Sequence, residues 1–347
     1  MADNRINILH IKRAVIIVCI LLLVSVVIIG TIGFKWKKSC DSFLANTIVS
    51  GEFLIEKGDG FNKTYAAIFS VESVPIGFST YLIKIRRFDK MIRYGYYEAN
   101  TISLETLINN IMSGKQTLTK ITFPEGYNMY DIAATIENAG LGDRIEMIRV
   151  FTDCSLILDL TGGSYESLEG FLAPGTYLFS KKYPAEKIAA KMVYEFYKIL
   201  PPDFEIKAKK LGLSFYDALI LASIVQKETY DKEESPIVAA VFLNRIKSKM
   251  LIQADPTIIY GMYDRYSGNI RKADLIDKSN RFNTYRHRGL PPTPISNPSI
   301  IAIKAVINPA NSDYYYFVAT KDGKHVFARD YDEHKRNVRI HQLGLSR

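Results

Sequence analysis

The feature that most constrains this chain is an uncharged apolar run, AVIIVCILLLVSVVIIGTIGF, at residues 14–34. As a helix rising about 1.5 Å per residue, it is long enough to cross the roughly 30 Å hydrocarbon core of a bilayer. A cleaved signal peptide has a shorter apolar core and a small-residue cleavage site, whereas the basic stretch KWKK follows this run at 35–38. We therefore predict one retained transmembrane helix at 14–34, preceded by a cytoplasmic tail at 1–13.

Charge constrains the orientation and the partners only broadly. Three basic residues before the run are matched by three directly after it, so flanking charge does not decide the orientation, but the long remainder of the chain is expected to be translocated. The formal net charge of +9 suits anionic partners such as lipid headgroups or cell-wall polymer. The basic residues are scattered and lack an aromatic RNA-binding signature, so we predict no nucleic-acid partner.

Cysteine is too scarce for a disulfide-stabilised scaffold. Cys19 lies in the apolar run, which leaves Cys40 and Cys154 as the two that could form a bridge. The sequence leaves open whether they pair.

The chain beyond the run contains two weakly similar copies of one structural pattern. After a juxtamembrane linker at 35–50, the first copy has a short strand and turn at 51–60, and Asn62 is a candidate cap for the helix that follows. An amphipathic run at 78–88 then leads to a strand at 93–99.

The second copy has clearer signals. A strand at 121–123 precedes a helix that Asn128 and Asp131 begin with a capping box, and a closing strand is expected at 174–180. We interpret 51–183 as one region with an internal repeat of β-α-α-β type. Such units either lie against carbohydrate, or serve as spacers or pack on the domain that follows.

From residue 184 the pattern changes to longer helices. They are predicted at 184–200, 215–229 and 236–248, the last with Ser235 as its N-cap. This change predicts a separate C-terminal domain.

The end of the chain mixes loops with short elements. Stretches dense in Pro, Asn and Gly follow residue 250, and a helix is predicted near 298–307. The turn Asp322-Gly323 lies between alternating apolar residues, which predicts a β-hairpin. The predicted fold class is α+β, with the C-terminal domain at 184–347.

One helix of this domain ends in the polar residues of LASIVQKETY. Ser214 and Asp217 form a capping box that fixes where the helix begins. At about 100° per residue, Glu228 lies on the same stripe as Leu221, while Gln226 falls on the opposite side. A carboxyl among apolar side chains holds its proton near neutral pH, as a general acid requires. The alternative is that Glu228 lies in a frayed, solvated last turn.

The segment VFLNRIKSKMLIQADPTIIYGM, at 241–262, mixes polar side chains with apolar anchors, as a sugar-binding cleft does. Its polar members include Asn244, Arg245, Gln253, Asp255 and Tyr260. Asp255 precedes Pro256 and can equally serve as a helix-entry residue.

Two further groups are interpreted as structural. His287, His325 and His334 lack metal-binding spacing, so they are expected to be exposed or hydrogen-bonded, and no metal site is predicted. Tyrosines 314–316 alternate faces in a strand, so core packing is expected for them.

Motifs along the whole chain after the apolar run carry a family resemblance. They are FPEGY at 123–127, LEGFLAPGTY at 168–177, ASIVQKET at 222–229, VFLNRI at 241–246, MLIQADPTIIYGM at 250–262, FNTY at 282–285, GLPPTPISNP at 289–298 and YYFVA at 315–319. In this order they resemble the YceG-like family, the endolytic murein transglycosylases of the MltG type. The resemblance implies a LysM-like region at 51–183 and a catalytic domain at 184–347. It also implies a single-pass protein of the bacterial cytoplasmic (inner) membrane, with the catalytic domain on the periplasmic, extracytoplasmic side.

The resemblance also implies the chemistry. Such an enzyme is a lyase that cuts between N-acetylmuramic acid and N-acetylglucosamine within nascent peptidoglycan strands, leaves 1,6-anhydro ends and limits strand elongation, with no cofactor. Glu228 matches the catalytic glutamate, and the candidates for holding the glycan are Asn244, Arg245, Gln253, Asp255, Tyr260, Asn283 and Tyr285. Gln226 departs from the family, which commonly has glutamate there.

The implied partners are glycan strands, the membrane and peptidoglycan synthases. The alternative function is a catalytically silent, peptidoglycan-binding scaffold of the wall-synthesis machinery. The presence of Glu228 favours the enzyme over the scaffold.

Overall fold

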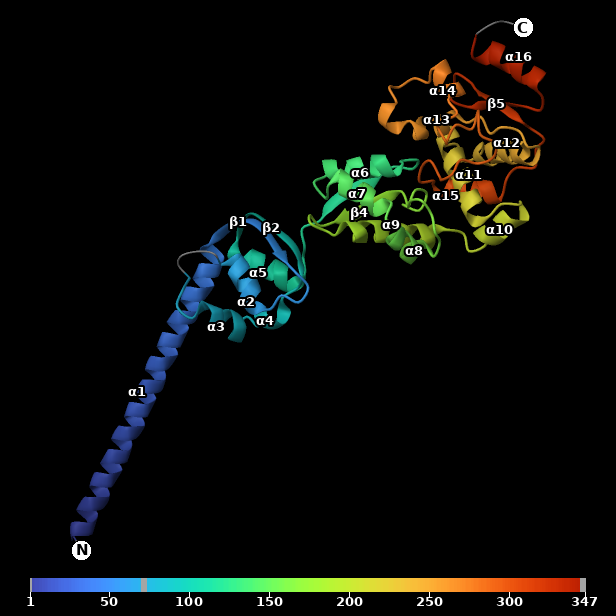
Figure 1. Cartoon of the computed structure of the whole chain (residues 1–347). Helices are drawn as coiled ribbons and strands as arrows, with labels where there is room; N and C mark the ends of the chain where they lie inside the picture. Colours follow the sequence, from blue (N-terminus) through green and yellow to red (C-terminus); the bar gives the residue numbers. More distant parts are fainter. Residues whose placement is uncertain (1, 70–73, 344–347) are drawn as a thin grey trace. The chain divides into compact units, whose positions relative to one another are not determined.

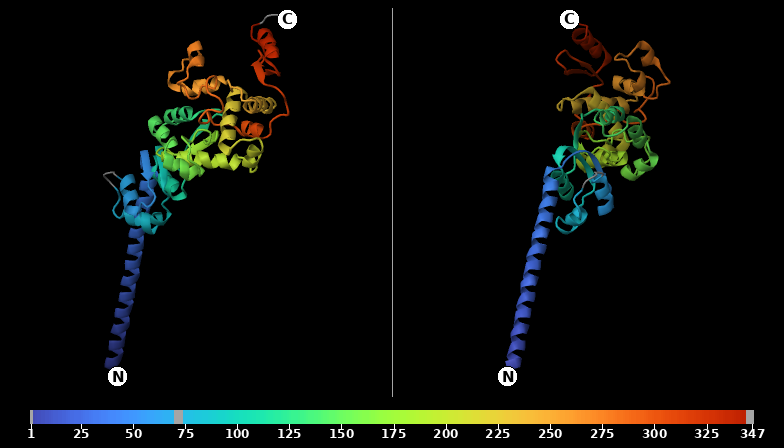
Figure 2. Two further views of the ribbon diagram at one scale, coloured as in Figure 1. Left: turned by 45° about the vertical axis from the view of Figure 1, so that its right-hand side comes forward. Right: turned by 90° about the vertical axis from the view of Figure 1, so that its left-hand side faces the viewer.

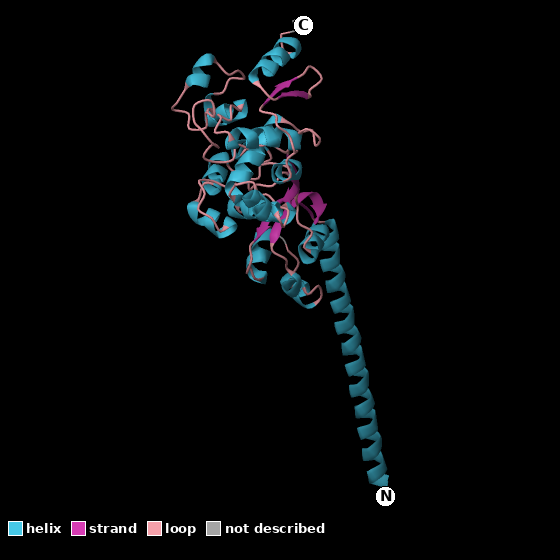
Figure 3. Ribbon diagram, turned by 90° about the vertical axis from the view of Figure 1, so that its right-hand side faces the viewer, coloured by secondary structure: helices cyan, strands magenta, loops and turns pink. Residues whose placement is uncertain are grey.

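The computed structural model describes residues 2–69 and 74–343. By its internal packing the chain divides into two compact units, Met1–Leu118 and Thr119–Arg347. Figure 1 labels the helices and strands of both. The strands of the described residues form three two-stranded antiparallel ladders among many helices, so the fold is mixed α and β (Figure 3).

The first unit combines one ladder with five helices in its described part. Its elements are α1 (Ala2–Asn46), β1 (Ile48–Ile55), α2 (Phe61–Ile68), α3 (Phe78–Lys84), α4 (Phe88–Met91), β2 (Gly95–Ser103) and α5 (Leu104–Ser113). β1 pairs with β2 around a bulge between Val49 and Gly51. The side chains of Cys40 and Leu44, near the end of α1, are fully buried in this unit's core.

α1 is one helix from the apolar run into this core. It holds one candidate membrane span, at Lys12–Asn46. The stretch predicted as a linker, 35–50, is occupied by helix through Asn46 and then by the start of β1.

One local prediction in this unit is wrong, and two others have the right type of element with different bounds. α2 begins after Gly60 without a side-chain cap, so Asn62 lies inside the helix instead of capping it. The run at 78–88 is split into α3 and α4 because Arg87 adopts a left-handed φ of 54°. The strand predicted at 93–99 begins at Gly95 and continues to Ser103.

The second unit is mainly helical. Its elements up to the central helix are β3 (Thr119–Phe123), α6 (Met129–Asn138), α7 (Arg144–Phe151), α8 (Cys154–Thr161), β4 (Gly175–Phe179), α9 (Ala185–Ile199), α10 (Phe204–Lys210) and α11 (Phe215–Glu228). Then come α12 (Ser235–Lys247), α13 (Asp255–Gly261), a 3₁₀ turn (Tyr263–Arg265), α14 (Lys272–Ile276), α15 (Ile300–Ile307), β5 (Tyr316–Ala319), β6 (His325–Ala328) and α16 (Tyr331–His341).

Several predictions in this unit are confirmed. The Asn128–Asp131 capping box starts α6, and the predicted closing strand is β4, which pairs with β3. The hairpin around Asp322-Gly323 is β5–β6. Ser235 is not the N-cap of α12, because Glu234 occupies that position and the Ser235 hydroxyl donates instead to the Asp231 carbonyl at 2.7 Å.

α11 is the central helix of the second unit and packs against α10, α12, α13 and α15. Every residue from Ala218 to Gln226 is buried. The two further views in Figure 2 show neighbouring helices around it. The burial stops at Gln226: Lys227 is exposed and Glu228 is partly exposed, so the helix leaves the core in its last turn.

Residues 119–183 and 184–347 share one hydrophobic core. Asn297 joins them directly: its Oδ1 accepts from the Gly170 and Leu172 amides, both at 2.9 Å, and its Nδ2 donates to Glu169 at 2.8 Å. The division by packing therefore falls after Leu118, and residue 184 lies inside the second unit.

Candidate functional site

Glu228 is the last residue of α11, and it is partly exposed although the helix before it is buried. The capping box that begins this helix is formed as predicted, with the Asp217 amide donating to Ser214 Oγ at 3.0 Å. Within residues 2–69 and 74–343, no group donates a hydrogen bond to the Glu228 carboxyl. The carboxyl is therefore free to bond a ligand.

Glu228 lines a cleft of about 520 Å³, here called the Glu228 cleft. The walls come from α11, α12, the segment around Gln253, the β5–β6 hairpin and α16. The lining residues are Glu228, Phe242, Arg245, Ile252, Gln253, Asp255, Tyr285, Tyr316, Phe317, Val318, Ala319, His325, Tyr331, His334, Val338 and Gln342. The cleft combines two carboxyls, a guanidinium and amide groups with aromatic faces, a composition suited to binding a carbohydrate.

The environment of Glu228 raises its pKa to about 7. Burial is the largest cause, because it disfavours the charged carboxylate, and the negative charge of Asp255 adds to it. The Arg245 guanidinium opposes the rise. The carbonyl end of α11 also disfavours negative charge. Near neutral pH, Glu228 can therefore both give and accept a proton.

Arg245 is a buried cation that holds two walls of the cleft together. Its Nε donates to the Tyr315 carbonyl at 2.6 Å, and its Nη1 donates to the Ile252 carbonyl at 2.8 Å. Its guanidinium carbon lies 5.1 Å from the centroid of the Tyr316 ring. Burial lowers the pKa of Arg245, yet an arginine remains charged at physiological pH.

Asp255 and Tyr285 form a hydrogen-bonded pair in the cleft. The Tyr285 hydroxyl donates to Asp255 Oδ1 at 2.6 Å. Burial and this bond raise the pKa of Tyr285, so the phenol stays protonated. Asp255 is the first residue of α13, whose N-cap position is Ala254. Asp255 thus keeps its carboxylate in the cleft instead of capping the helix.

Three of the predicted glycan-binding residues lie elsewhere. The Asn244 amide donates to the Ser312 and Tyr314 carbonyls at 2.9 and 3.0 Å. Asn283 is fully buried and donates to backbone carbonyls, including that of Asp277 at 2.8 Å. Both amides organise loops, so the prediction that they meet ligand is not supported by their positions.

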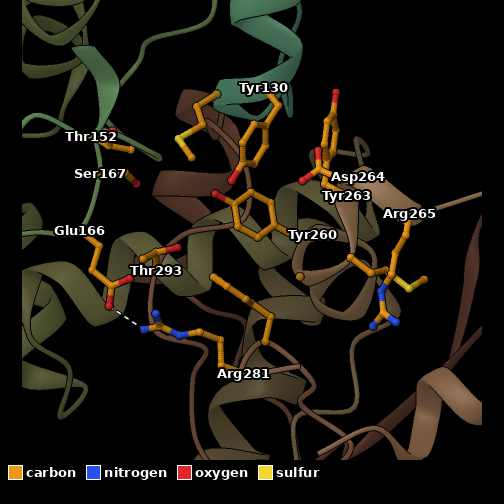
Figure 4. Close-up of a pocket in the computed structure, with 14 residues that line it drawn as sticks. Tyr130, Thr152, Glu166, Ser167, Tyr260, Tyr263, Asp264, Arg265, Arg281 and Thr293 are labelled. Carbon is orange, nitrogen blue, oxygen red and sulfur yellow. Dashed lines mark hydrogen bonds and ion pairs between the residues drawn. The ribbon is translucent and has the colours of Figure 1, made fainter. Parts of the chain in front are cut away.

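The third of these residues, Tyr260, lines a different hollow of about 450 Å³, shown in Figure 4. Its hydroxyl donates to Glu169 Oε2 at 3.0 Å. Nearby, the rings of Tyr130 and Tyr263 stack with centroids 4.7 Å apart, and Arg281 pairs with Glu166 at 2.6 Å.

Glu169 is the other carboxyl of this unit whose pKa is strongly raised, to about 8, chiefly by burial. It is fully buried and accepts from the Met129 amide, the Tyr260 hydroxyl and the Asn297 amide. With its oxygens occupied and no solvent contact, Glu169 cannot reach a substrate. Glu228 is therefore the better candidate for acid chemistry.

One part of the lining of the Glu228 cleft was not predicted. It is made by Tyr316, Tyr331 and His334, from the hairpin and α16. The Tyr316 and His334 rings stack with centroids 5.1 Å apart. His325 binds Glu234 instead, with Nδ1 2.8 Å from Oε2. The tyrosine run and the histidines were visible in the sequence, but no sequence signal placed them in one cleft with Glu228.

Gln226 is buried, and its Oε1 accepts from the Ser299 amide at 2.8 Å, at the start of α15. The sequence argument that α11 has one buried stripe is wrong, because the helix is buried on all sides. Gln226 does not line the Glu228 cleft. No group of three or more His, Cys, Asp or Glu residues in a metal-binding arrangement occurs in the described part of the chain.

Comparisons with known proteins agree on one family. The profile of the YceG-like family matches residues 53–340. An endolytic murein transglycosylase of Bacillus subtilis (strain 168) is 28% identical over 257 residues, which cover 70% of this chain and 71% of that protein. The enzyme of the same name from Streptococcus pneumoniae (strain D39) is 30% identical over 283 residues, 72% of this chain. This match spans about half, 51%, of the pneumococcal protein.

A solved structure is also similar. It is the crystal structure of a putative YceG-like protein from Listeria monocytogenes, 27% identical in sequence. The match has a TM-score of 0.56 and covers 84% of this chain and 99% of the other.

Proposed function

Since this chain belongs to the YceG-like family, we propose that it is an endolytic murein transglycosylase in which Glu228 is the catalytic acid and base. Its substrate is the glycan strand of peptidoglycan, cut between N-acetylmuramic acid and N-acetylglucosamine. The observation that carries the residue assignment is the position of Glu228: an unpaired carboxyl with a pKa of about 7, facing a cleft lined by polar and aromatic groups.

The first step is protonation of the leaving group. Protonated Glu228 gives its proton to the glycosidic oxygen, and the bond from that oxygen to the muramic acid C1 breaks with positive charge developing on the sugar ring. The Asp255 carboxylate, held by the Tyr285 hydroxyl, supplies negative charge in the same cleft. That charge favours the developing cation.

The second step closes a new ring. The C6 hydroxyl of the same muramic acid attacks C1, and Glu228, now a carboxylate, accepts the hydroxyl proton. The products are a 1,6-anhydro sugar and a free C4 hydroxyl, and no water is consumed. Because the nucleophile is tethered to the reacting ring, proximity replaces a nucleophilic side chain of the protein.

Membrane anchoring completes the proposal. α1 contains the apolar run, and none of the side chains in its apolar stretch is buried by the rest of the chain. This supports one membrane span at 14–34. The tail at 1–13 is then proposed to be cytoplasmic and the second unit extracytoplasmic. Residues 51–183 are proposed as the LysM-like region and 184–347 as the catalytic domain, with 119–183 packed into the same core as that domain. Peptidoglycan synthases are the proposed protein partners, because cleavage of nascent strands requires proximity to their synthesis.

The test is digestion of purified sacculi by the full chain in detergent, followed by mass analysis of the products. Wild type is expected to release fragments with anhydro ends, and Glu228→Gln to release none, because an amide cannot donate the proton. The matched control is Glu233→Gln, since Glu233 is an exposed glutamate outside the cleft.

Other products would contradict the proposal in distinct ways. Fragments with reducing ends only would indicate a hydrolase that uses Asp255 as a second carboxyl. Binding to sacculi without any product from wild type would indicate the scaffold function. Equal product from wild type and Glu228→Gln would remove Glu228 from the mechanism.

A further inference from the structure

The first unit is built directly onto the helix that carries the apolar run. Cys40 and Leu44 are fully buried in that unit's core, and the Tyr81 hydroxyl donates to Asp41. The Trp36 and Tyr81 rings also meet edge to face, with centroids 6.1 Å apart. α1 is therefore part of the folded unit, and the height of this unit above a membrane is set by the helix.

Trp36 fixes which part of the unit lies at the membrane surface. The apolar run ends at Phe34, and two residues further along a helix is a rise of only about 3 Å. The Trp36 Nε1 donates to the Ile76 carbonyl at 2.9 Å. The backbone at Ile76 must therefore lie at the level of Trp36, in the interfacial zone where tryptophan is enriched.

The exposed side chains of α3 and of the segments just before and after it are apolar and basic. Ile76 is 94% exposed, which is the largest exposure of any large apolar side chain in the described part of the chain. Ile83 and Ile85 are exposed beside it in the sequence, as are the cations Lys84 and Arg87. α3 packs against α1 and lies at the end of the unit nearest the apolar run (Figures 1 and 2).

We propose that this α3 surface, made of Ile76, Ile83, Lys84, Ile85 and Arg87, docks on the bilayer itself. The isoleucines enter the boundary between headgroups and acyl chains, and the two cations lie among anionic phosphates. The occupant is lipid because α3 packs against α1, the helix that carries the proposed membrane span. The basic KWKK stretch at 35–38 adds charge of the same sign. The first unit is thus seated on the membrane instead of tethered above it.

This inference rests on the proposed span at 14–34, and the experiment tests the two separately. The full chain is placed in nanodiscs of phosphatidylglycerol and phosphatidylcholine, with Cys19→Ala and Cys154→Ser removing the two exposed thiols. A spin label is attached to one new cysteine at a time, at Val24, Ile76, Ile83 or Ile48. Its accessibility to oxygen, which concentrates in lipid, is compared with that to a water-soluble nickel complex.

Ile48 is the matched control, because it is an exposed isoleucine of the same unit, 58% accessible, beyond the end of α1. The label at Ile76 is expected to show an oxygen-to-nickel ratio several-fold higher than at Ile48, and Ile83→Cys provides a second site if Ile76→Cys impairs folding. Equal oxygen-to-nickel ratios at Ile76, Ile83 and Ile48, with lipid-like accessibility at Val24, would contradict docking of the α3 surface but leave the membrane span intact. Water-like accessibility at Val24 would overturn both.

Discussion

At the scale of single residues, the proposed chemistry depends on three charged groups in one cleft. Glu228 holds its proton near neutrality because burial and Asp255 outweigh Arg245. A group of this kind is protonated below pH 7 and ionised above it. The acid step therefore has a pH limit set by its neighbours.

The pH profile should report this balance. We expect kcat/KM to fall as pH rises through about 7, the pKa of Glu228, because the proton donor is lost. Asp255→Asn removes the repulsion, so the pKa of Glu228 should fall and the decline should begin at lower pH. Asparagine can still accept from Tyr285. The measurement is release of anhydro products from pH 5 to 9.

The matched control for the shift of the pH profile is Asp153→Asn. Asp153 caps the N-terminus of α8 and does not line the cleft. Its profile should coincide with that of wild type. If Asp255→Asn leaves the alkaline decline in place, Asp255 does not set the pKa of Glu228.

The polar residues of the sequence motifs predicted part of this site. Arg245, Gln253, Asp255 and Tyr285 do line the Glu228 cleft. Asn283 does not, because its amide satisfies three backbone carbonyls of a loop that no periodicity reveals. An asparagine in a polar motif serves a buried loop or a ligand equally well, and only the packing distinguishes them.

At the scale of elements, α16 forms a wall of the cleft although none of its residues is buried. Its sequence, YDEHKRNVRIH, has no apolar stripe, so no helix was predicted there. Contacts with β5 and β6 hold it in place. The hairpin was predictable because an Asp-Gly turn is a local signal, whereas α16 depends on tertiary contacts.

The cap of α16 offers a test of its role. Asp330 accepts from the Glu333 amide at 2.8 Å, and Asp330→Ala should cost about 1 kcal/mol of helix stability. We expect faster amide exchange in α16 and a higher KM for glycan, because Tyr331 and His334 lose their fixed positions.

The control removes an equivalent cap elsewhere: Asp153 accepts from the Leu156 amide at 2.8 Å. Asp153→Ala should have a similar local cost but leave KM unchanged. A normal KM in Asp330→Ala, despite faster exchange in α16, would show that this wall does not contact substrate.

At the scale of the whole molecule, the change of pattern at residue 184 does not mark a break in packing. Asn297 bonds Glu169 and the Tyr127 carbonyl, which lie 128 and 170 positions away. Contacts of such sequence separation leave no trace in composition or periodicity. The predicted boundary followed helix length, while the core of the second unit spans both sides of it.

Two fragments should therefore behave differently. We expect residues 119–347 to unfold in one cooperative thermal transition, because they form one compact unit. Residues 184–347 should aggregate or lack a cooperative transition, because the faces of α9 and α11 that pack against 119–183 become exposed. Calorimetry of both fragments provides the comparison, and a cooperative transition in 184–347 would restore the boundary at residue 184.

The position of Gln342 in the lining of the Glu228 cleft has a practical consequence for imaging this protein in cells. A fluorescent protein attached directly after Gln342 would lie at the rim of the cleft and would compete with the polymer for access. A fusion made before α1 attaches the reporter to an element that contributes no residue to this cleft.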